Sequence, residues 1–368
     1  MPFASNSASA GVGLSGVGIA PDPSASPPTT TPPLAPSIKL PKPSGNEVCG
    51  IVGSTDVIFK NGFEIADQTL AVLRTMRSVT KSPAGSGTPT ITITFPAAGQ
   101  TLASTTTPVT GTFTGPADTG VVVNGVLAYT SGTSFLVPDV PLASGSNTLQ
   151  AVATTLPGAT AQSSVSVTQG GTIGSVALTS TSLTGFAPFA TVFSPVITGN
   201  VAISQLKIDF DGNGIDDVVT TSPTTPLPHT YATPGLYTAR LTIVDNTTTP
   251  NPTTYVVYQR VLAQDNVELR ETLCSVYGYL RTNLSAANVT SAVLAFDPDR
   301  RAHYQNLFGS ISNANLPVAA SRLGTIANGL ISTDYAQLKV VKTFQGTTAS
   351  FPMNFSRDDS GVWRIDSM

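Results

Sequence analysis

Alternating hydrophobic and polar residues dominate the middle of the chain. The first clear run contains Ile91, Ile93 and Phe95, each separated from the next by a threonine. Side chains of a strand point alternately to its two faces, so this two-residue period predicts half-buried β-strands. Turn residues divide such runs, and Asn124-Gly125, directly after three valines, predicts a tight hairpin. Short strands at these intervals predict two tandem β-sandwiches, at residues 89–168 and 176–263.

The hydrophobic period changes after residue 264. Asp265 and Glu268 have the spacing of a helix capping box. An apolar face at helical spacing follows, formed by Leu269, Leu273, Val276, Tyr277 and Leu280. Two further helices are expected, one at 289–296 and one after Asp297-Pro298 whose buried side chains are Tyr304, Leu307 and Phe308.

Strand alternation returns at the end of the chain, at 336–340, at 351–355 with Phe351 on the apolar face, and at 363–365. Helices first and an antiparallel sheet afterwards are typical of an α+β arrangement. The sequence therefore predicts a small α+β domain at 264–368 whose sheet is curved. The whole chain is expected to be multi-domain and mainly β.

Residues 1–88 have a different character. A Gly-rich stretch at 10–20 precedes a Pro-, Ser- and Thr-rich run from 21 to about 43. Such a segment buries too little apolar surface to offset its conformational entropy, which predicts a disordered stalk with one short helix near Leu70 and Leu73. No basic residue precedes Lys39, so the positive start of a secretory signal is not visible. One expectation is therefore that the chain is part of a longer polypeptide.

Composition narrows the class of protein. Charged residues make up 11% of the chain, against about 25% in an average domain. Scarce Glu and Lys disfavour a mainly helical fold, whereas Thr, Gly and Pro suit strands and turns. The net charge of −3 gives no attraction to phosphate backbones, so no nucleic-acid partner is expected. No apolar run approaches the ~20 residues of a membrane-spanning helix, so no membrane span is expected.

The two cysteines, Cys49 and Cys274, leave two alternatives open. In an oxidising compartment they pair and tie the N-terminal segment to the last domain. Otherwise both stay as thiols. Neither has the spacing of a metal or redox motif, and only His229 and His303 are available as histidine ligands, so a zinc site is not expected.

The two predicted sandwiches resemble known extracellular modules. Residues 89–168 resemble bacterial Ig-like domains, through the stretches TITITFPAAGQTL, PVTGTFTG, VVVNG and VPLASGSNTLQAVAT. Residues 176–263 are similar to PKD-type Ig-like domains, through GFAPFATVF and HTYATPGLYTARLTIVD. These resemblances imply spacer or binding modules that contact sugars or proteins and have no catalytic role.

The segment 208–217 stands where PKD-type domains usually have Trp-Asp-Phe-Gly-Asp-Gly. Ca²⁺ binds six to eight oxygens, and alternate carboxylates around a glycine turn supply them. The predicted calcium ligands are Asp209, Asp211, Asn213, Asp217 and the carbonyl of Ile215. Thr220 stands where an EF-hand has its bidentate Glu, so the expected Kd is about 10⁻⁴–10⁻³ M, as in extracellular modules. The alternative is a hairpin that caps itself by side-chain hydrogen bonds.

The closing stretch DDSGVWRIDSM makes the last domain similar to the NTF2-like (cystatin-like cone) family. That resemblance implies a cone that holds a small hydrophobic molecule, with a carboxylate or His in the family's isomerases and dehydratases. The candidates here are Asp297, Asp299, His303 and Tyr304. All lie around one helix start, where Asp297 is explained as an N-cap and His303 as a solvated neighbour of two arginines. No catalytic residue is therefore assigned.

The sequence favours a non-enzymatic secreted or cell-surface protein whose Ig-like spacers present a C-terminal α+β binding or packing domain. Its location is expected to be secreted, periplasmic or at the cell surface, and its partner a carbohydrate or a protein there. One alternative is a small-molecule-binding or isomerase-like enzyme that uses the cone. The other is an accessory region of a longer secreted polysaccharide-processing enzyme or adhesin.

Overall fold

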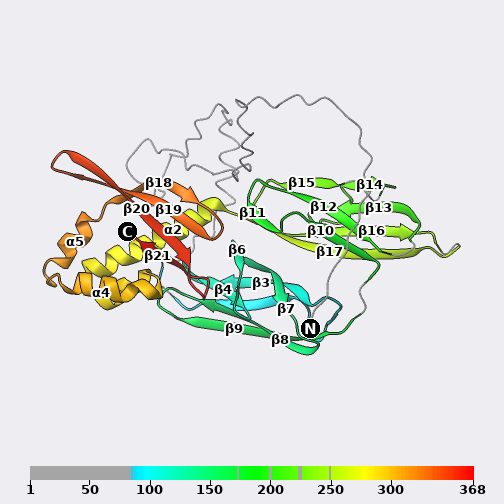
Figure 1. The fold of residues 1–368 in the computed structure, drawn as a ribbon, viewed down its shortest axis with the longest axis horizontal. Coiled ribbons are helices and arrows are strands. Elements are labelled where there is room, and N and C mark those ends of the chain that lie inside the picture. The colour runs from blue at the N-terminus through cyan, green and yellow to red at the C-terminus, as the bar shows by residue number, and fades with distance from the viewer. Residues whose placement is uncertain (1–83, 86, 172–173, 199–200, 223–225, 248–249) are drawn as a thin grey trace, which may run out of the picture. The chain divides into compact units, whose positions relative to one another are not determined.

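The computed structural model describes residues 84–85, 87–171, 174–198, 201–222, 226–247 and 250–368. Within them, two β-sandwiches follow one another along the chain, and a group of helices precedes a final antiparallel sheet (Figure 1). The predicted fold class, mainly β with Ig-like sandwiches and helices near the C-terminal end, is confirmed. The predicted stalk and its short helix lie outside the described residues.

Nine strands of the described residues form the first sandwich. One sheet has the order β1-β3-β7-β6 and contains Thr90–Phe95 (β1), Thr106–Thr114 (β3), Ser134–Pro141 (β7) and Tyr129–Ser131 (β6). The other has the order β2-β9-β8-β4-β5 and contains Thr101–Leu102 (β2), Thr160–Gln169 (β9), Gly145–Thr154 (β8), Gly120–Val123 (β4) and Val126–Leu127 (β5). Val109, Phe135 and Leu149 are fully buried in the shared core. Asn124 and Gly125 both have positive φ, so the predicted hairpin is confirmed.

The second sandwich also consists of two sheets. The smaller, in the order β10-β12-β15, contains Val176–Ser180 (β10), Phe189–Ile197 (β12) and Leu227–Tyr231 (β15). The larger, in the order β11-β17-β16-β13-β14, contains Thr184–Phe186 (β11), Thr253–Gln264 (β17), Gly235–Asp245 (β16), Ile203–Asp209 (β13) and Val218–Thr220 (β14). Ala239, Leu241 and Ile243 of β16 are fully buried, as their alternation predicts.

The C-terminal region begins with the long helix α2 (Asn266–Ser285), whose N-cap Asp265 accepts a hydrogen bond from the Val267 N–H at 2.8 Å. Short helical segments follow, namely α3 (Val289–Ala292), η1 (Val293–Ala295), η2 (Pro298–Arg300), α4 (Arg301–Gly309) and α5 (Leu316–Arg322). An antiparallel meander closes the region, with β18 (Thr325–Ile331), β19 (Tyr335–Phe344), β20 (Thr347–Arg357) and β21 (Trp363–Ser367). Leu273 and Val276 of α2 share one core with Leu338 and Phe355 of the sheet.

Two side chains of this region contradict the sequence prediction. Leu307 is 47% exposed, because the short α4 packs through Tyr304 and Phe308 instead. Phe351 is 53% exposed. Since β21 pairs only with residues 354–357 of β20, the part of β20 that holds Phe351 pairs with β19 alone. Neither α5 nor β18 was predicted.

The first sandwich packs directly on the C-terminal region. Leu156, in the turn between β8 and β9, is 1% exposed and shares a hydrophobic core with residues of α2 and β21. Arg364 of β21 is 4% exposed and donates to the carbonyl oxygens of Leu156 and Leu294, at 2.8 and 2.5 Å. Its Nε also pairs with Asp358 at 2.8 Å. This buried guanidinium therefore links the turn of the sandwich to two elements of the C-terminal region.

The same interface includes a close approach of two backbones. A Cβ at position 120 would lie 2.2 Å from the carbonyl carbon of Gly361, so this packing requires Gly120. The Thr272 hydroxyl of α2 donates to the carbonyl of Ala117 at 3.0 Å. A cavity of about 40 Å³ remains between the two parts, and Trp363, the one tryptophan of the sequence, lies in its wall.

Cys274 lies on α2 and is disulfide-bonded. The other cysteine of the chain, Cys49, lies outside the described residues. Cys274 is therefore not a free thiol.

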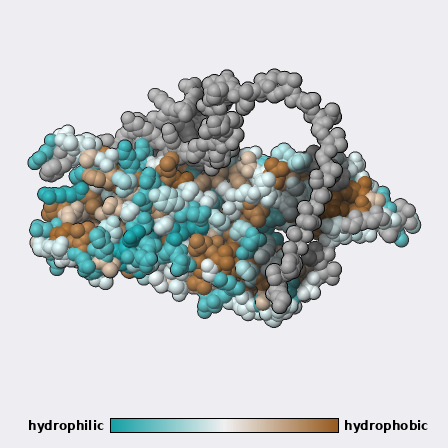
Figure 2. Space-filling view, viewed as in Figure 1, coloured by the Kyte–Doolittle hydropathy of each residue, from teal (hydrophilic) through white to brown (hydrophobic). Residues whose placement is uncertain are grey.

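The visible surface is mixed in character. Figure 2 shows hydrophobic residues in separate patches between hydrophilic and weakly polar ones. Large apolar side chains with more than half of their surface exposed include Ile215, Val219 and Phe351. No helix of the described residues has both the length and the apolar composition needed to cross a membrane.

Candidate functional site

The predicted calcium ligands lie in the loop that joins β13 to β14 in the second sandwich. Gly212 and Gly214 have φ values of +76° and +92°, a left-handed conformation that strains other residues. A Cβ at position 212 would also lie 2.8 Å from the Thr238 carbonyl oxygen of β16. The two glycines therefore let the loop turn back tightly along the sheet.

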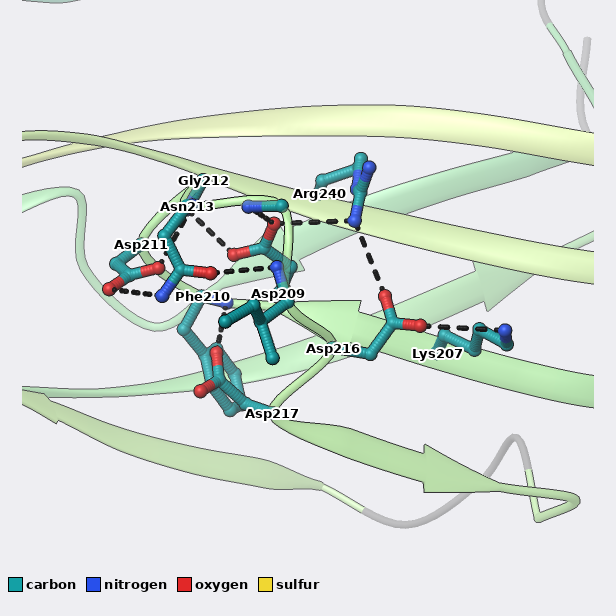
Figure 3. A network of polar contacts seen from close by, with 11 residues as sticks. Lys207, Asp209, Phe210, Asp211, Gly212, Asn213, Asp216, Asp217 and Arg240 are labelled. Carbon is teal, nitrogen blue, oxygen red and sulfur yellow. Dashed lines mark hydrogen bonds and ion pairs between the residues drawn. The ribbon is translucent and has the colours of Figure 1, made fainter.

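Asp209 occupies the centre of this loop (Figure 3). Its side chain is 1% exposed, and its two carboxylate oxygens accept the N–H groups of Gly212 and Gly214 at 2.8 and 2.9 Å. Arg240 of β16, its partner in the strand register, lies 3.3 Å from the second oxygen. Burial opposes ionisation of Asp209, but the hydrogen bonds and the guanidinium outweigh it and hold the pKa of Asp209 below its ordinary value. Asp209 is therefore a buried carboxylate that stays ionised.

The other predicted ligands surround Asp209. Asp211 accepts the N–H and the side-chain amide of Asn213 at 3.1 and 3.0 Å, and the side-chain oxygen of Asn213 accepts the Ile215 N–H at 2.7 Å. Asp217 accepts the Phe210 N–H at 2.7 Å. These bonds are what the alternative prediction, a self-capped hairpin, requires.

The positions of the carboxylates also satisfy a requirement of calcium. Asp209, Asp211 and Asp217 each offer one oxygen, and these three oxygens lie within 4.8 Å of one another. Calcium binds oxygen at 2.3–2.6 Å, so two of its ligands can be at most about 5 Å apart. The three carboxylates therefore fit around one ion. Ile215 is 72% exposed, and because its side chain is a hydrocarbon, its backbone carbonyl is its only ligand group.

Residues that the sequence did not single out support the loop. The Tyr231 hydroxyl donates to the Phe210 carbonyl at 2.9 Å, and burial raises the pKa of Tyr231, so the phenol stays protonated. Asp216 points away from the carboxylate cluster, toward Arg240 at 3.3 Å and Lys207 at 3.5 Å (Figure 3). Arg240 thus bridges the loop and the sheet. Its role depends on the pairing of β13 with β16, which no local pattern in the sequence reveals.

The four catalytic candidates lie around the start of α4. Asp297 accepts the Asp299 N–H at 3.0 Å and caps η2, as predicted. His303 is exposed and meets the ring of Tyr304 edge-on. Tyr304 stacks on Phe296 with centroids 3.7 Å apart, and its hydroxyl accepts the Met368 N–H at 3.2 Å. Asp297 and Tyr304 thus have structural roles in capping and packing.

A separate pocket of about 320 Å³ opens in the C-terminal region. Tyr277 of α2 forms part of its wall, together with the segment 322–324, residues of β19 and β20, and Met368. None of the four catalytic candidates is among its lining residues, and these described lining residues include no Asp, Glu or His side chain.

No protein-family model matches the chain, and a comparison with the curated proteins finds no match. Among solved structures, the chain is similar to the fibronectin(III)-like modules of Clostridium thermocellum CbhA, with 14% identity over 48% of this chain and 94% of that one, and a TM-score of 0.18. Murine CEACAM1b is 9% identical over 48% of this chain and 99% of its own, with a TM-score of 0.18.

A third neighbour is SGBP-B of the Bacteroides ovatus mixed-linkage glucan utilization locus, in complex with a mixed-linkage heptasaccharide. It is 16% identical over 49% of this chain and 48% of its own, with a TM-score of 0.18. At such TM-scores these fibronectin-III-like and Ig-like neighbours carry no argument about function. The assignment of β-sandwiches rests on the sheets of this chain.

Proposed function

We propose that the chain is a non-enzymatic, extracytoplasmic modular protein whose first Ig-like module holds the C-terminal α+β domain in a fixed position. The contact between these two parts is the observation that carries the proposal. Arg364 and Leu156, which come from different modules, are both buried at this contact. The first module thus acts as more than a spacer, and the C-terminal domain is the part that it presents.

The energetics of Arg364 favour a permanent contact. A buried charge is costly unless hydrogen bonds and an opposite charge compensate it. The Leu156 carbonyl supplies one of these bonds, and Asp358 supplies the charge. Separation of the two parts would remove that bond and expose Leu156. The first module and the C-terminal domain are therefore expected to stay in contact and to unfold together.

The proposal assigns the second module to the PKD-type domains and the C-terminal domain to the NTF2-like group. The loop 208–217 is then a calcium site that stiffens one end of the second sandwich. Support for calcium comes from the three carboxylate oxygens within 4.8 Å of one another and from the ionised state of buried Asp209. The partner of the presented domain is a carbohydrate or a protein at the cell surface.

Two shortened chains test the proposed role of the first module. In one, residues 176–263 are replaced by a long Gly/Ser linker, and in the other residues 89–168 are deleted. The first should keep the fluorescence and cooperative unfolding of the region around Trp363, because the Leu156 contact is intact. The chain without residues 89–168 should lose both the native fluorescence of Trp363 and the cooperative unfolding of that region. A chain without residues 89–168 that still folds its C-terminal domain would refute the proposal.

A second candidate function is the binding of a small apolar molecule by the C-terminal domain. The pocket of about 320 Å³ favours it, since pockets for small ligands measure roughly 300–1,000 Å³. The isomerase alternative expects a carboxylate or His side chain at the substrate, and the described lining residues include no Asp, Glu or His.

A further inference from the structure

The C-terminal pocket has an apolar interior. Tyr277, Val340 and Met353 belong to the hydrophobic core, and they continue to the surface through Leu323 and Phe351. Phe351 is 53% exposed, so a large apolar side chain borders the opening. Apolar surface that faces water in this way gains free energy when another apolar group covers it.

The one hydroxyl in the apolar part of the wall is already engaged. Tyr277 donates to the Gly324 carbonyl at 2.7 Å, in a buried hydrogen bond. Burial raises the pKa of Tyr277 to about 12, so this phenol stays protonated and keeps its partner at neutral pH. The interior therefore suits a hydrocarbon chain better than a sugar, which needs several hydrogen-bond partners.

Two cations, Arg322 and Lys342, complete the lining. Lys342 follows Val340 by two positions on β19, so both side chains point to the same face of the strand. Its ammonium group donates to the Ser321 carbonyl at 3.2 Å, next to the exposed Arg322. An ammonium has three donors, which leaves Lys342 able to bind an anion.

We propose that this pocket binds a single-chain amphipathic carboxylate, with its hydrocarbon tail along Val340 and Met353 and its head at Arg322 and Lys342. The inference rests on the second candidate function and adds the charge and shape of the ligand. A cavity of 150 Å³ holds benzene, so one of about 320 Å³ accommodates a chain of roughly ten carbons. Decanoate is therefore the probe.

The full chain, labelled with ¹³C at its methionine methyl groups, gives a direct readout. Of its four methionines, Met353 and Met368 lie in the pocket wall, and the variants Met353→Leu and Met368→Leu assign their signals. Decanoate, kept below the concentration at which it forms micelles, should shift both signals in a saturable way. Octanoate should bind about tenfold more weakly, because two methylenes fewer are buried.

Charge is tested with the double variant Arg322→Gln and Lys342→Gln. It should weaken decanoate binding roughly fivefold and leave the binding of 1-decanol unchanged. A matched control neutralises Arg300 and Lys339, which are exposed and do not line the pocket. The variant Phe351→Ser should weaken both ligands, and since Phe351 is exposed it should fold normally.

The outcomes separate this inference from the candidate function beneath it. If decanol and decanoate bind equally and the double variant changes neither, the carboxylate assignment is wrong while the apolar pocket stands. If neither ligand shifts the two methyl signals, both are wrong. Binding of the chain to anionic phosphatidylglycerol vesicles without any response to decanoate would also overturn the proposal, because the pocket would then face a membrane.

Discussion

The aspartates in and beside the loop between β13 and β14 divide into two sets. Asp209, Asp211 and Asp217 each bring one oxygen within 4.8 Å of the others, whereas Asp216 turns toward Arg240 and Lys207. This division follows the alternate spacing seen in the sequence. The spacing predicts which carboxylates gather, but the buried state of Asp209 comes from its β16 partner Arg240, which lies 31 positions later and has no local signature.

Calcium should stabilise the second sandwich through this loop. At 10 mM Ca²⁺ and a Kd of 10⁻⁴–10⁻³ M, the expected gain is about 1.4–2.7 kcal/mol, seen as a rise in melting temperature relative to excess EDTA. Asp211→Ala should abolish that rise, because a ligand oxygen is lost. Asp359→Ala, an exposed carboxylate in another domain, should retain it. An identical rise in the Asp211→Ala chain would exclude this loop as the site.

Asp358 gives the contact at Arg364 a dependence on pH. Burial opposes its ionisation, but hydrogen bonds from Ser360 and Arg364 prevail and hold the pKa of Asp358 below its ordinary value of 3.8. The ionised group therefore stabilises the fold above pH 3.8, and this contribution is lost as the pH falls through the lower folded pKa. Asp358→Asn should be less stable than the natural chain at pH 7 by about 1.5–3 kcal/mol.

The stability difference caused by Asp358→Asn should disappear as the pH falls below 3.8. Denaturant unfolding followed by Trp363 fluorescence measures it. The neighbouring exposed residue provides the control, since Asp359→Asn should behave like the natural chain at each pH. If the difference in unfolding free energy between Asp358→Asn and the natural chain stays constant with pH, the charge of Asp358 does not contribute to the contact.

Among the elements, strands were the most predictable. Alternation identified β1, β16 and β19, because one face of each strand is buried and the other is not. It misplaced Phe351, since part of β20 extends beyond the strands and helices that would cover its apolar face. The short α5 was missed because its seven residues are too few to establish a helical period.

The turn between β8 and β9 is an element whose role is visible only in three dimensions. In the sequence, Thr155-Leu156-Pro157-Gly158 looks like an ordinary hairpin end. Leu156→Ala should destabilise the unit that contains Trp363 by about 2–5 kcal/mol, because it leaves a cavity in a core that two modules share. Denaturant unfolding followed by Trp363 fluorescence measures the loss.

A matched leucine in the C-terminal region serves as the control for that measurement. Leu330 is 45% exposed, so Leu330→Ala should change the stability by no more than about 0.5 kcal/mol. Equal effects of the two substitutions would show that Leu156 is not part of the shared core.

At the scale of the whole molecule, the first sandwich packs on the C-terminal domain although the second sandwich separates them in the sequence. Arg364 and Leu156 are 208 positions apart, and nothing in either segment indicates the other. Composition and strand patterns predicted a mainly β chain with Ig-like sandwiches and helices near its C-terminal end. They did not reveal which modules pack together, because these contacts join residues far apart in the sequence and no local pattern in either segment indicates them.

Native-state hydrogen exchange of the full chain at increasing denaturant tests most directly whether the first sandwich and the C-terminal domain open as one unit. The most protected amides of β8, α2 and β20 should exchange through one opening, with the same free energy and the same denaturant dependence. Amides of β16 and β17, in the second sandwich, should follow a separate opening. If β8 instead opens at a free energy different from that of α2 and β20, the two parts fold independently and the account of a module that holds the C-terminal domain is contradicted.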